Sequence, residues 1–132
     1  MVLLILIITI NIMGMNGQTA VDPGKGFTLQ NEFVQYTFEP TGLGLSGMID
    51  RKTGFNHIQG VEGKHLLWEI AFGKGTMRPR INNNYKPCSY IKLYKKPNGD
   101  QIAVLQWNKM RFWEEDSIVS VEVTIELPES DG

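Results

Sequence analysis

Asp50 and His57 are the first side chains whose types and spacing suit chemistry, because an imidazole and a carboxylate meeting across a hairpin can form an acid/base pair. The same segment also suits a turn. Asp50 can accept hydrogen bonds from backbone amides two residues on, and Gly54 can adopt the positive φ that closes a type I turn with a bulge. Since no third catalytic group is evident, we predict a hairpin here, with Ile49 and Ile58 entering the core on either side.

Other acidic side chains are candidates for glycoside hydrolysis, which needs two carboxylates facing each other across a sugar. Glu69, Glu122 and Glu126 stand at alternate positions of apolar segments, where the solvated face of a strand explains them. Acids also gather beside an aromatic ring in "WEED", Trp113–Asp116, where they could grip a sugar or a calcium ion. This segment lacks the regular spacing of oxygen ligands found in a calcium loop, so we expect no calcium site there.

Metal binding and thiol catalysis find little support in the sequence. The two histidines, His57 and His65, and the single cysteine, Cys88, do not have the spacing of a zinc site. Cys88 has no patterned histidine or asparagine partner, so we expect a small buried residue rather than a nucleophile. The sequence therefore predicts no catalytic residue, no metal site and no cofactor in this chain.

Sugar binding is the chemistry that the polar loops fit better. Aromatic faces stack on pyranose rings, and planar polar side chains bind the hydroxyls. Trp68 and Trp107 lie inside apolar segments and are expected in the core. The longest polar loop is "GKGTMRPRINNNY", residues 73–85, for which a plain solvent-exposed loop is the alternative interpretation. The candidate carbohydrate-binding residues are Trp113, Arg78, Arg80 and Asn83.

Composition excludes some partners and some means of stabilisation. The chain has 132 residues, enough for one domain, and a formal net charge of −1. Such a charge does not suggest a nucleic acid or an acidic membrane as partner. Because Cys88 is alone, no intramolecular disulfide can form, and the fold must be held together by its core.

The N-terminal segment "MVLLILIITINIM" is a nearly unbroken apolar run, shorter than a membrane span of about 20 residues and typical of a signal-peptide core. We expect a signal peptide over residues 1–20, cleaved near Ala20, and a polar linker over residues 21–26. A retained anchor or a buried strand is the alternative, because no Lys or Arg precedes the run and Gln18 stands where a small residue is usual. Cleavage would place the mature chain outside the cell or in the periplasm, without a membrane partner.

Period-two alternation predicts strands through the rest of the chain. In the segment 117–127 one face is apolar, and Pro128 ends the pattern. The residues of that face are Val119, Val121, Val123, Ile125 and Leu127. In "PNGD", Asn98-Gly99 is the strongest short hairpin signal, and the segment 101–107 after it is apolar on both faces, as in a central strand.

Earlier segments show the same alternation. Within "FTLQNEFVQYTFEP", residues 27–40, the apolar pattern consists of Phe33, Tyr36 and Phe38 and breaks at Pro40. In the next segment one face is formed by Leu43, Leu45, Gly47 and Ile49. No window has helical periodicity, and turn signals recur throughout. We therefore predict an all-β, antiparallel β-sandwich of about seven or eight strands over residues 27–132.

The segment "LQNEFVQYTFEPTGLGLSGMIDRKTGFNHI", residues 29–58, resembles the opening of β-sandwich modules that begin many large secreted carbohydrate-active enzymes. "LLWEIAF", residues 66–72, is similar to the strand that often follows, and "VSVEVTIELPESD", residues 119–131, to one that later crosses the same sheet. These are the galactose-mutarotase-like, or supersandwich, modules of glycoside hydrolases and their relatives. The resembling motifs are mainly structural.

This resemblance implies a function and a partner. Supersandwich modules are much longer than 132 residues and precede a catalytic domain, so the chain is expected to be a fragment, incomplete at its C-terminus. The expected function is the non-catalytic N-terminal β-sandwich portion of a secreted carbohydrate-active enzyme. The partners would be the downstream catalytic domain of the same protein and a carbohydrate. The alternative is a stand-alone carbohydrate-binding or surface-interaction module.

Overall fold

The computed structural model describes residues 19–73, 79–111 and 118–130. These residues form nine β-strands and one short 3-10 helix, η1, and none of them is in an α-helix. In the described ranges, accordingly, no helix has the length and apolarity to cross a membrane. The elements are β1 (Thr19–Val21), η1 (Pro23–Lys25), β2 (Phe27–Gln30), β3 (Val34–Phe38), β4 (Leu45–Asp50), β5 (Glu69–Ala71), β6 (Arg80–Asn82), β7 (Tyr90–Lys95), β8 (Gln101–Arg111) and β9 (Ile118–Leu127).

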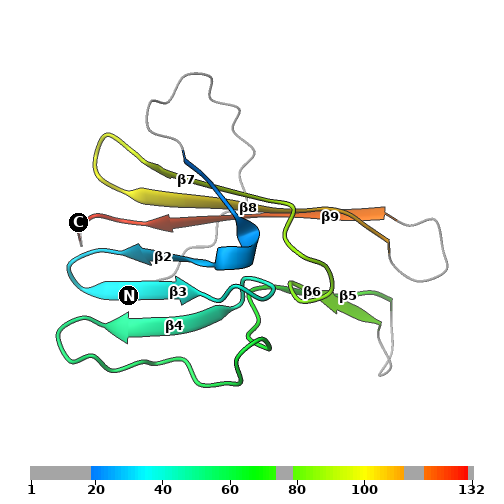
Figure 1. The fold of residues 1–132 in the computed structure, drawn as a ribbon, viewed down its shortest axis with the longest axis horizontal. Coiled ribbons are helices and arrows are strands. Elements are labelled where there is room, and N and C mark those ends of the chain that lie inside the picture. Colours follow the sequence, from blue (N-terminus) through cyan, green and yellow to red (C-terminus); the bar gives the residue numbers. More distant parts are fainter. Residues whose placement is uncertain (1–18, 74–78, 112–117, 131–132) are drawn as a thin grey trace.

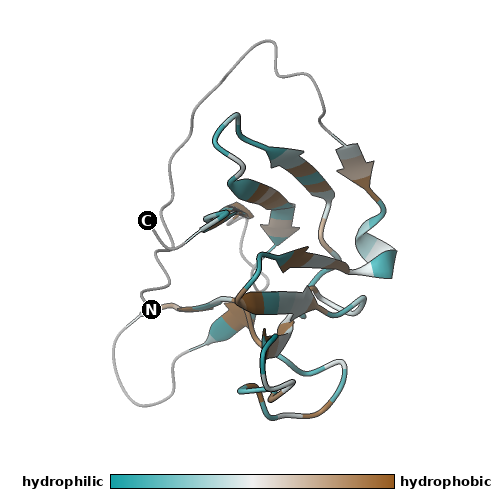
Figure 2. Ribbon diagram, turned by 90° about the vertical axis from the view of Figure 1, so that its left-hand side faces the viewer, coloured by the Kyte–Doolittle hydropathy of each residue, from teal (hydrophilic) through white to brown (hydrophobic). Residues whose placement is uncertain are grey.

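The strands form three antiparallel sheets, in the orders β1-β7-β8-β9, β2-β3-β4 and β5-β6. Seen nearly along the strands in Figure 2, the four-stranded sheet lies above the three-stranded sheet as a second layer. The small β5-β6 sheet lies beyond one end of β3 and β4 (Figure 1). This arrangement confirms the all-β, antiparallel sandwich predicted from the alternating sequence.

The core fills the space between the two larger sheets. Trp107 and Leu105 of β8 have no exposed surface, and Tyr36 and Phe38 of β3 face them from the other layer. Burial of a large apolar side chain contributes roughly 1.5–3 kcal/mol, so these residues supply much of the stability of a chain without disulfides. The remaining buried members of this cluster are Leu29, Val34, Leu43, Ile81, Cys88, Ile91, Ala103, Met110, Val123, Ile125 and Leu127.

Two predicted elements are confirmed in detail. In β9, Val123, Ile125 and Leu127 are buried, and the other two valines of the predicted face pack against the core. The Pro97-Asn98-Gly99 loop joins β7 to β8, with Gly99 at a φ of 95° and its N–H donating to the Lys96 carbonyl. The strand that follows this hairpin, β8, is central, between β7 and β9.

The predicted faces of β3 and β4 need correction. Thr37 pairs with Gly47 but Phe38 pairs with Leu45, so Ser46 is an extra residue, a β-bulge, that reverses the facing of the strand. As a result Met48 packs against the core, whereas Ile49 is half-buried outside the core cluster, like Ile58. Phe33 is likewise exposed, because it precedes β3, and its neighbour Val34 is the residue that points inward.

The N-terminal end of the described chain belongs to the sandwich. Thr19–Val21 pairs with β7, and Val21 packs against the core. After it, Asp22 caps η1 by accepting a hydrogen bond from the Gly24 N–H. The region predicted as a linker, residues 21–26, therefore contains the end of β1 and all of η1, and most of the predicted signal peptide lies outside the described residues.

Candidate functional site

The predicted carbohydrate-binding residues do not gather in one place. Trp113 and Arg78 lie outside the described residues. Arg80, in β6, is exposed and forms an ion pair with Glu69 of β5 at 2.7 Å. Asn83, directly after β6, has no exposed surface. Arg80 and Asn83 are therefore near in sequence, but one faces solvent and the other the interior.

Asn83 ties together three backbone segments. Its Oδ1 accepts hydrogen bonds from the N–H of Leu67 and of Trp68, at 2.8 and 3.4 Å. Its Nδ2 donates to the carbonyls of Gly42 and His65, at 3.0 and 3.1 Å. A buried amide with this many partners replaces water for backbone groups that would otherwise be unsatisfied. In this fold Asn83 is a structural residue.

The segment around Asp50 is a turn, as predicted. The Asp50 carboxylate accepts hydrogen bonds from the N–H of Lys52 and of Thr53, at 2.8 and 3.0 Å. Gly54 has a φ of 74° and donates to the Asp50 carbonyl. The hydrogen bonds from Thr53 and Lys52 lower the pKa of the Asp50 carboxyl. The His57 ring lies edge-on to Phe55 with centroids 4.9 Å apart, and Asp50 remains occupied by its own turn.

The remaining sequence candidates have structural positions. Cys88 is buried, its thiol donates to the carbonyls of Tyr90 and Gln106, and burial raises its pKa. The position of Cys88 confirms the prediction of a small buried residue. Trp68 and Trp107 contact each other in a T-shaped arrangement with centroids 5.3 Å apart, within or against the core as predicted.

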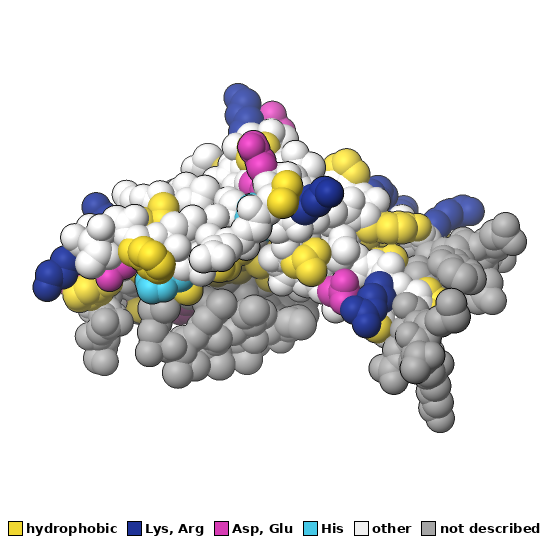
Figure 3. All heavy atoms as spheres, turned by 90° about the horizontal axis from the view of Figure 1, so that it is seen from below, with side chains coloured by type: hydrophobic (Ala, Val, Ile, Leu, Met, Phe, Trp, Pro, Cys, Tyr) yellow, Lys and Arg dark blue, Asp and Glu magenta, His cyan; other side chains and the backbone are white. Residues whose placement is uncertain are grey.

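Several large apolar side chains of the described residues are exposed, among them Phe55, Val61 and Leu66 at 59, 63 and 50 %. Figure 3, which views the molecule from below, shows the described apolar side chains scattered among polar and charged ones rather than gathered into one patch. Singly exposed apolar side chains are ordinary for a protein surface and do not mark a binding site.

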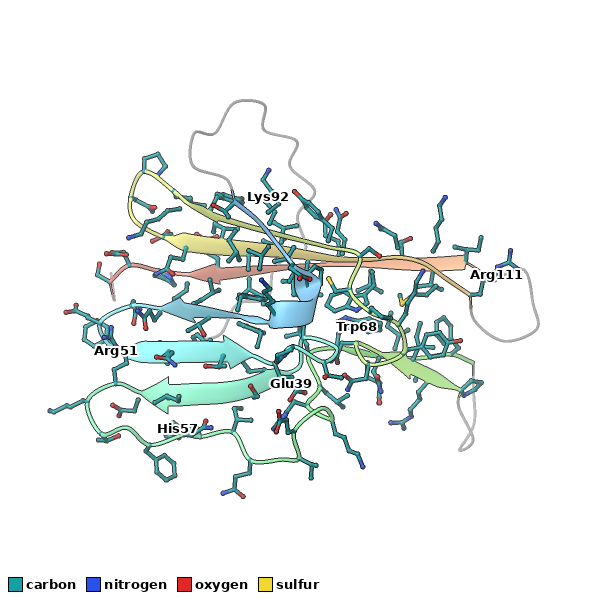
Figure 4. The ribbon with its side chains drawn as sticks, viewed as in Figure 1. Glu39, Arg51, His57, Trp68, Lys92 and Arg111 are labelled. Carbon is teal, nitrogen blue, oxygen red and sulfur yellow. The ribbon has the colours of Figure 1, made fainter. Side chains whose placement is uncertain are left out.

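No pattern in the sequence indicates the contact between the buried Glu39 and the largely covered His65. Glu39 directly follows β3 and is only 4 % exposed. Its Oε2 lies 3.0 Å from His65 Nδ1 and accepts the N–H of Gly63, while its Oε1 accepts the N–H of His65. Figure 4 shows Glu39 at the end of β3, beside the loop that follows β4. Glu39 therefore holds this loop by three hydrogen bonds.

The environment of Glu39 determines its charge. Burial raises its pKa, but the hydrogen bonds from Gly63 and from the backbone and ring of His65 outweigh this effect and leave the pKa below its ordinary value. Since an ionised carboxylate only accepts, His65 Nδ1 must donate to it, which in the neutral imidazole leaves Nε2 as the acceptor. The close approach needs Gly44, because a Cβ there would lie 2.0 Å from the His65 carbonyl oxygen.

Glu39 and His65 stand at the wall of a cleft of about 410 Å³. The cleft extends over the outer face of the three-stranded sheet, where one residue from each strand lines it: Thr28 of β2, Thr37 of β3 and Ser46 of β4. Its volume is within the range of small-molecule sites. A buried carboxylate–imidazole pair beside a void is the arrangement in the described structure that best fits a functional site.

A larger hollow of about 600 Å³ lies near the ends of β2 and β7. Several of its polar side chains are already engaged: Gln101 exchanges hydrogen bonds with the backbone of Gln30, and Arg51 donates to the Asn31 carbonyl. Lys95 forms an ion pair with Glu129 at its rim. We therefore regard this hollow as a product of the packing between turns and take the smaller cleft as the candidate site.

The cleft offers hydrogen bonding and one oriented imidazole. Among the residues that the structure describes, no three His, Cys, Asp or Glu side chains gather closely enough to hold a metal ion. The polar side chains that line this cleft include Glu39, His65 and the hydroxyls of Thr28, Thr37 and Ser46. Comparison with models of known families, with curated protein sequences and with solved structures gives no match to this chain.

Proposed function

We propose that this chain is the non-catalytic N-terminal β-sandwich portion of a secreted carbohydrate-active enzyme of the glycoside hydrolase type, with a galactose-mutarotase-like fold. In this proposal residues 1–20 direct secretion, and catalysis belongs to a domain further along the same protein. The resemblance of residues 29–58, 66–72 and 119–131 to such modules gives the enzyme class. The edges of the two sheets support the idea that the sandwich continues.

The edge formed by β9 carries this proposal. β9 is a strand of ten residues that pairs with β8 along one side, and no strand within the described residues pairs with its other side. A long, regular and open edge is a template for another strand. In the proposed enzyme, a later strand of the same protein pairs with β9 and extends the four-stranded sheet.

The edge formed by β4 differs, because this chain covers it itself. Asn56, beyond the turn, accepts a hydrogen bond from the Met48 N–H and donates to the Ser46 carbonyl. Backbone pairing of Ile49 with Asn56 continues the contact. Since the fold protects one edge in this way, the open edge of β9 is a specific feature that further strands would explain.

The test compares two proteins: residues 21–132 alone, and the longer product of the same reading frame. We expect the frame to continue past Gly132, the longer protein to hydrolyse glycosides, and the β9 amides to exchange hydrogen more slowly in it than in the short chain. A stop codon directly after Gly132, or equal exchange of β9 in both proteins, would contradict the proposal.

A stand-alone carbohydrate-binding module is the second candidate, and the hydroxyl-lined cleft favours it. It requires that residues 21–132 alone are monomeric and bind a sugar, and that the frame ends after Gly132. A glycan array with the mature chain, repeated with Trp113→Ala, measures such binding and whether the predicted residue Trp113 contributes to it.

A further inference from the structure

The outer face of the three-stranded sheet presents a row of hydroxyl groups. Thr28 of β2 is directly opposite Thr37 of β3, and Thr37 is opposite Gly47 of β4. The bulge at Ser46 adds a third hydroxyl at this level, and Ser46 Oγ donates to the Thr37 carbonyl at 3.2 Å. Thr28 is exposed, while Thr37 and Ser46 are half-buried. Three strands thus contribute one hydroxyl each to a single level of the sheet.

These hydroxyls lie in the cleft of about 410 Å³ whose wall contains Glu39 and His65. Phe27 and Phe38, which stack with centroids 4.4 Å apart and pack in or against the core, also border this cleft. The cleft therefore combines neutral hydrogen-bonding groups and an oriented imidazole in a volume that a small molecule can fill.

The charges at the cleft argue against an anionic ligand. Glu39 is ionised and already accepts three hydrogen bonds, from Gly63 and from the backbone and ring of His65. Of the other charged residues that line the cleft, Lys25 and Glu62 have opposite signs. An apolar ligand would remove water from Thr28, Thr37 and Ser46 without replacing its hydrogen bonds, which is unfavourable. A neutral ligand that both donates and accepts fits these groups.

We propose that this cleft binds one neutral sugar ring, whose hydroxyls pair with those of Thr28, Thr37 and Ser46 and with the imidazole of His65. The proposal rests on the carbohydrate-related part of the proposed function and gives it a site. The site differs from the segments in which the sequence predicted sugar binding, those of Trp113, Arg78 and Arg80, because it is built on the face of the three-stranded sheet.

The test measures binding of free D-galactose and D-glucose to the complete chain by titration calorimetry, with inorganic phosphate as the anionic probe. In the double variant Thr37→Val, Ser46→Ala both hydroxyls are lost with little change in volume. The matched control is Thr124→Val, which removes the same group from β9 of the four-stranded sheet, away from the cleft. Unfolding in urea verifies that all three proteins are folded.

We expect saturable binding of at least one sugar, an affinity at least about tenfold lower in the double variant, and no change in the control; tenfold corresponds to about 1.4 kcal/mol. Equal binding by wild type and double variant would overturn the cleft as the site. Preference for phosphate, or no sugar binding by the wild type, would overturn the ligand class.

Failure of this inference remains distinguishable from failure of the proposed function. Continuation of the frame, glycoside hydrolysis by the longer protein and protection of β9 do not depend on the cleft. If those results are positive and the calorimetry is negative, the chain is a module without its own sugar site. If the frame ends after Gly132 and the calorimetry is positive, the stand-alone binding module replaces the proposed function and the cleft stands.

Discussion

Asn83 and Glu39 are two buried polar side chains that both form hydrogen bonds with the backbone of His65. Asn83 Nδ2 donates to the His65 carbonyl, and Glu39 Oε1 accepts the His65 N–H. Asn83 is neutral and wholly enclosed, whereas Glu39 is ionised, paired with an imidazole and lines a cleft. Both fix the loop between β4 and β5, but only one faces a space that a ligand can enter.

The difference shows how a structural polar group can be told from a candidate functional one. An enclosed amide with every hydrogen bond made is explained by the backbone groups it satisfies. A charge buried beside a void is harder to explain by stability, since desolvation opposes it and an apolar pair is often as stable. The Asn83 and Glu39 positions should therefore respond differently to substitution, pH and ligand.

Asn83→Ala should have the largest effect on stability. It removes the partners of the Leu67 N–H and of the Gly42 carbonyl, and each unsatisfied buried group costs about 1–3 kcal/mol. We expect the free energy of unfolding in urea to fall by roughly 3–5 kcal/mol. The matched control is Asn84→Ala, because Asn84 is exposed but also donates to the His65 carbonyl. If this variant lowered the free energy of unfolding by more than about 1 kcal/mol, enclosed and exposed amides would not differ as proposed.

Gly44→Ala tests the contact that brings the loop against the sheet. Because the added Cβ would lie 2.0 Å from the backbone oxygen of His65, the loop must move away. We expect the free energy of unfolding to fall by about 2–3 kcal/mol. Gly54→Ala serves as the control, since its φ of 74° disfavours a side chain although no atom lies within 4 Å. Its expected loss is about 1 kcal/mol. If Gly44→Ala lowered the free energy of unfolding no more than Gly54→Ala, the His65 backbone would not need Gly44 for its close approach.

Glu39→Gln should destabilise the protein in a pH-dependent way. Because the pKa of Glu39 is lowered in the folded state, its contribution is complete above the ordinary glutamate pKa of about 4.3 and is lost as the pH falls through the lower folded value. Near pH 7 we expect the substitution to lower the free energy of unfolding by about 1–3 kcal/mol, as for the loss of hydrogen bonds to a charged group. The difference between wild type and variant, measured by urea unfolding, should shrink below about pH 4. A constant difference would mean that Glu39 acts only through packing.

Arg80→Ala should have the smallest effect. Its ion pair with Glu69 is exposed, and such pairs contribute about 0–1 kcal/mol, less at high salt. Sugar affinity should stay unchanged, because Arg80 does not line the cleft. If calorimetry showed weaker sugar binding in Arg80→Ala than in the double variant at Thr37 and Ser46, the binding site would belong to the loop predicted from the sequence instead.

The sequence was sufficient for the features that depend on local pattern. Alternation predicted the buried face of β9, the Asn98-Gly99 signal predicted the hairpin before β8, and Asp50 with Gly54 predicted the turn. The class of fold followed from these elements, since strands with one apolar face must pack against another layer.

The features that the sequence did not predict depend on the path of the loops. Nothing in the sequence marks Ser46 as a bulge, so the pattern predicts Ile49 on the core face, where the structure has Met48 instead. The whole of β4 and most of the loop after it separate Glu39 from His65 in the sequence, and no periodicity connects the two residues. Asn83 is one of three consecutive asparagines, and only the fold distinguishes the enclosed one.

The perpendicular contact between Trp68 and Trp107 gives the protein an intrinsic spectroscopic probe of its folding. Trp107 is in a strand of the four-stranded sheet, while Trp68 immediately precedes β5 of the small sheet, so the pair spans two parts of the core. Two indoles this close couple their electronic transitions, which gives a paired positive and negative band in circular dichroism. That signal should appear only once the small sheet has docked, and its kinetics would report this step of folding separately from strand formation.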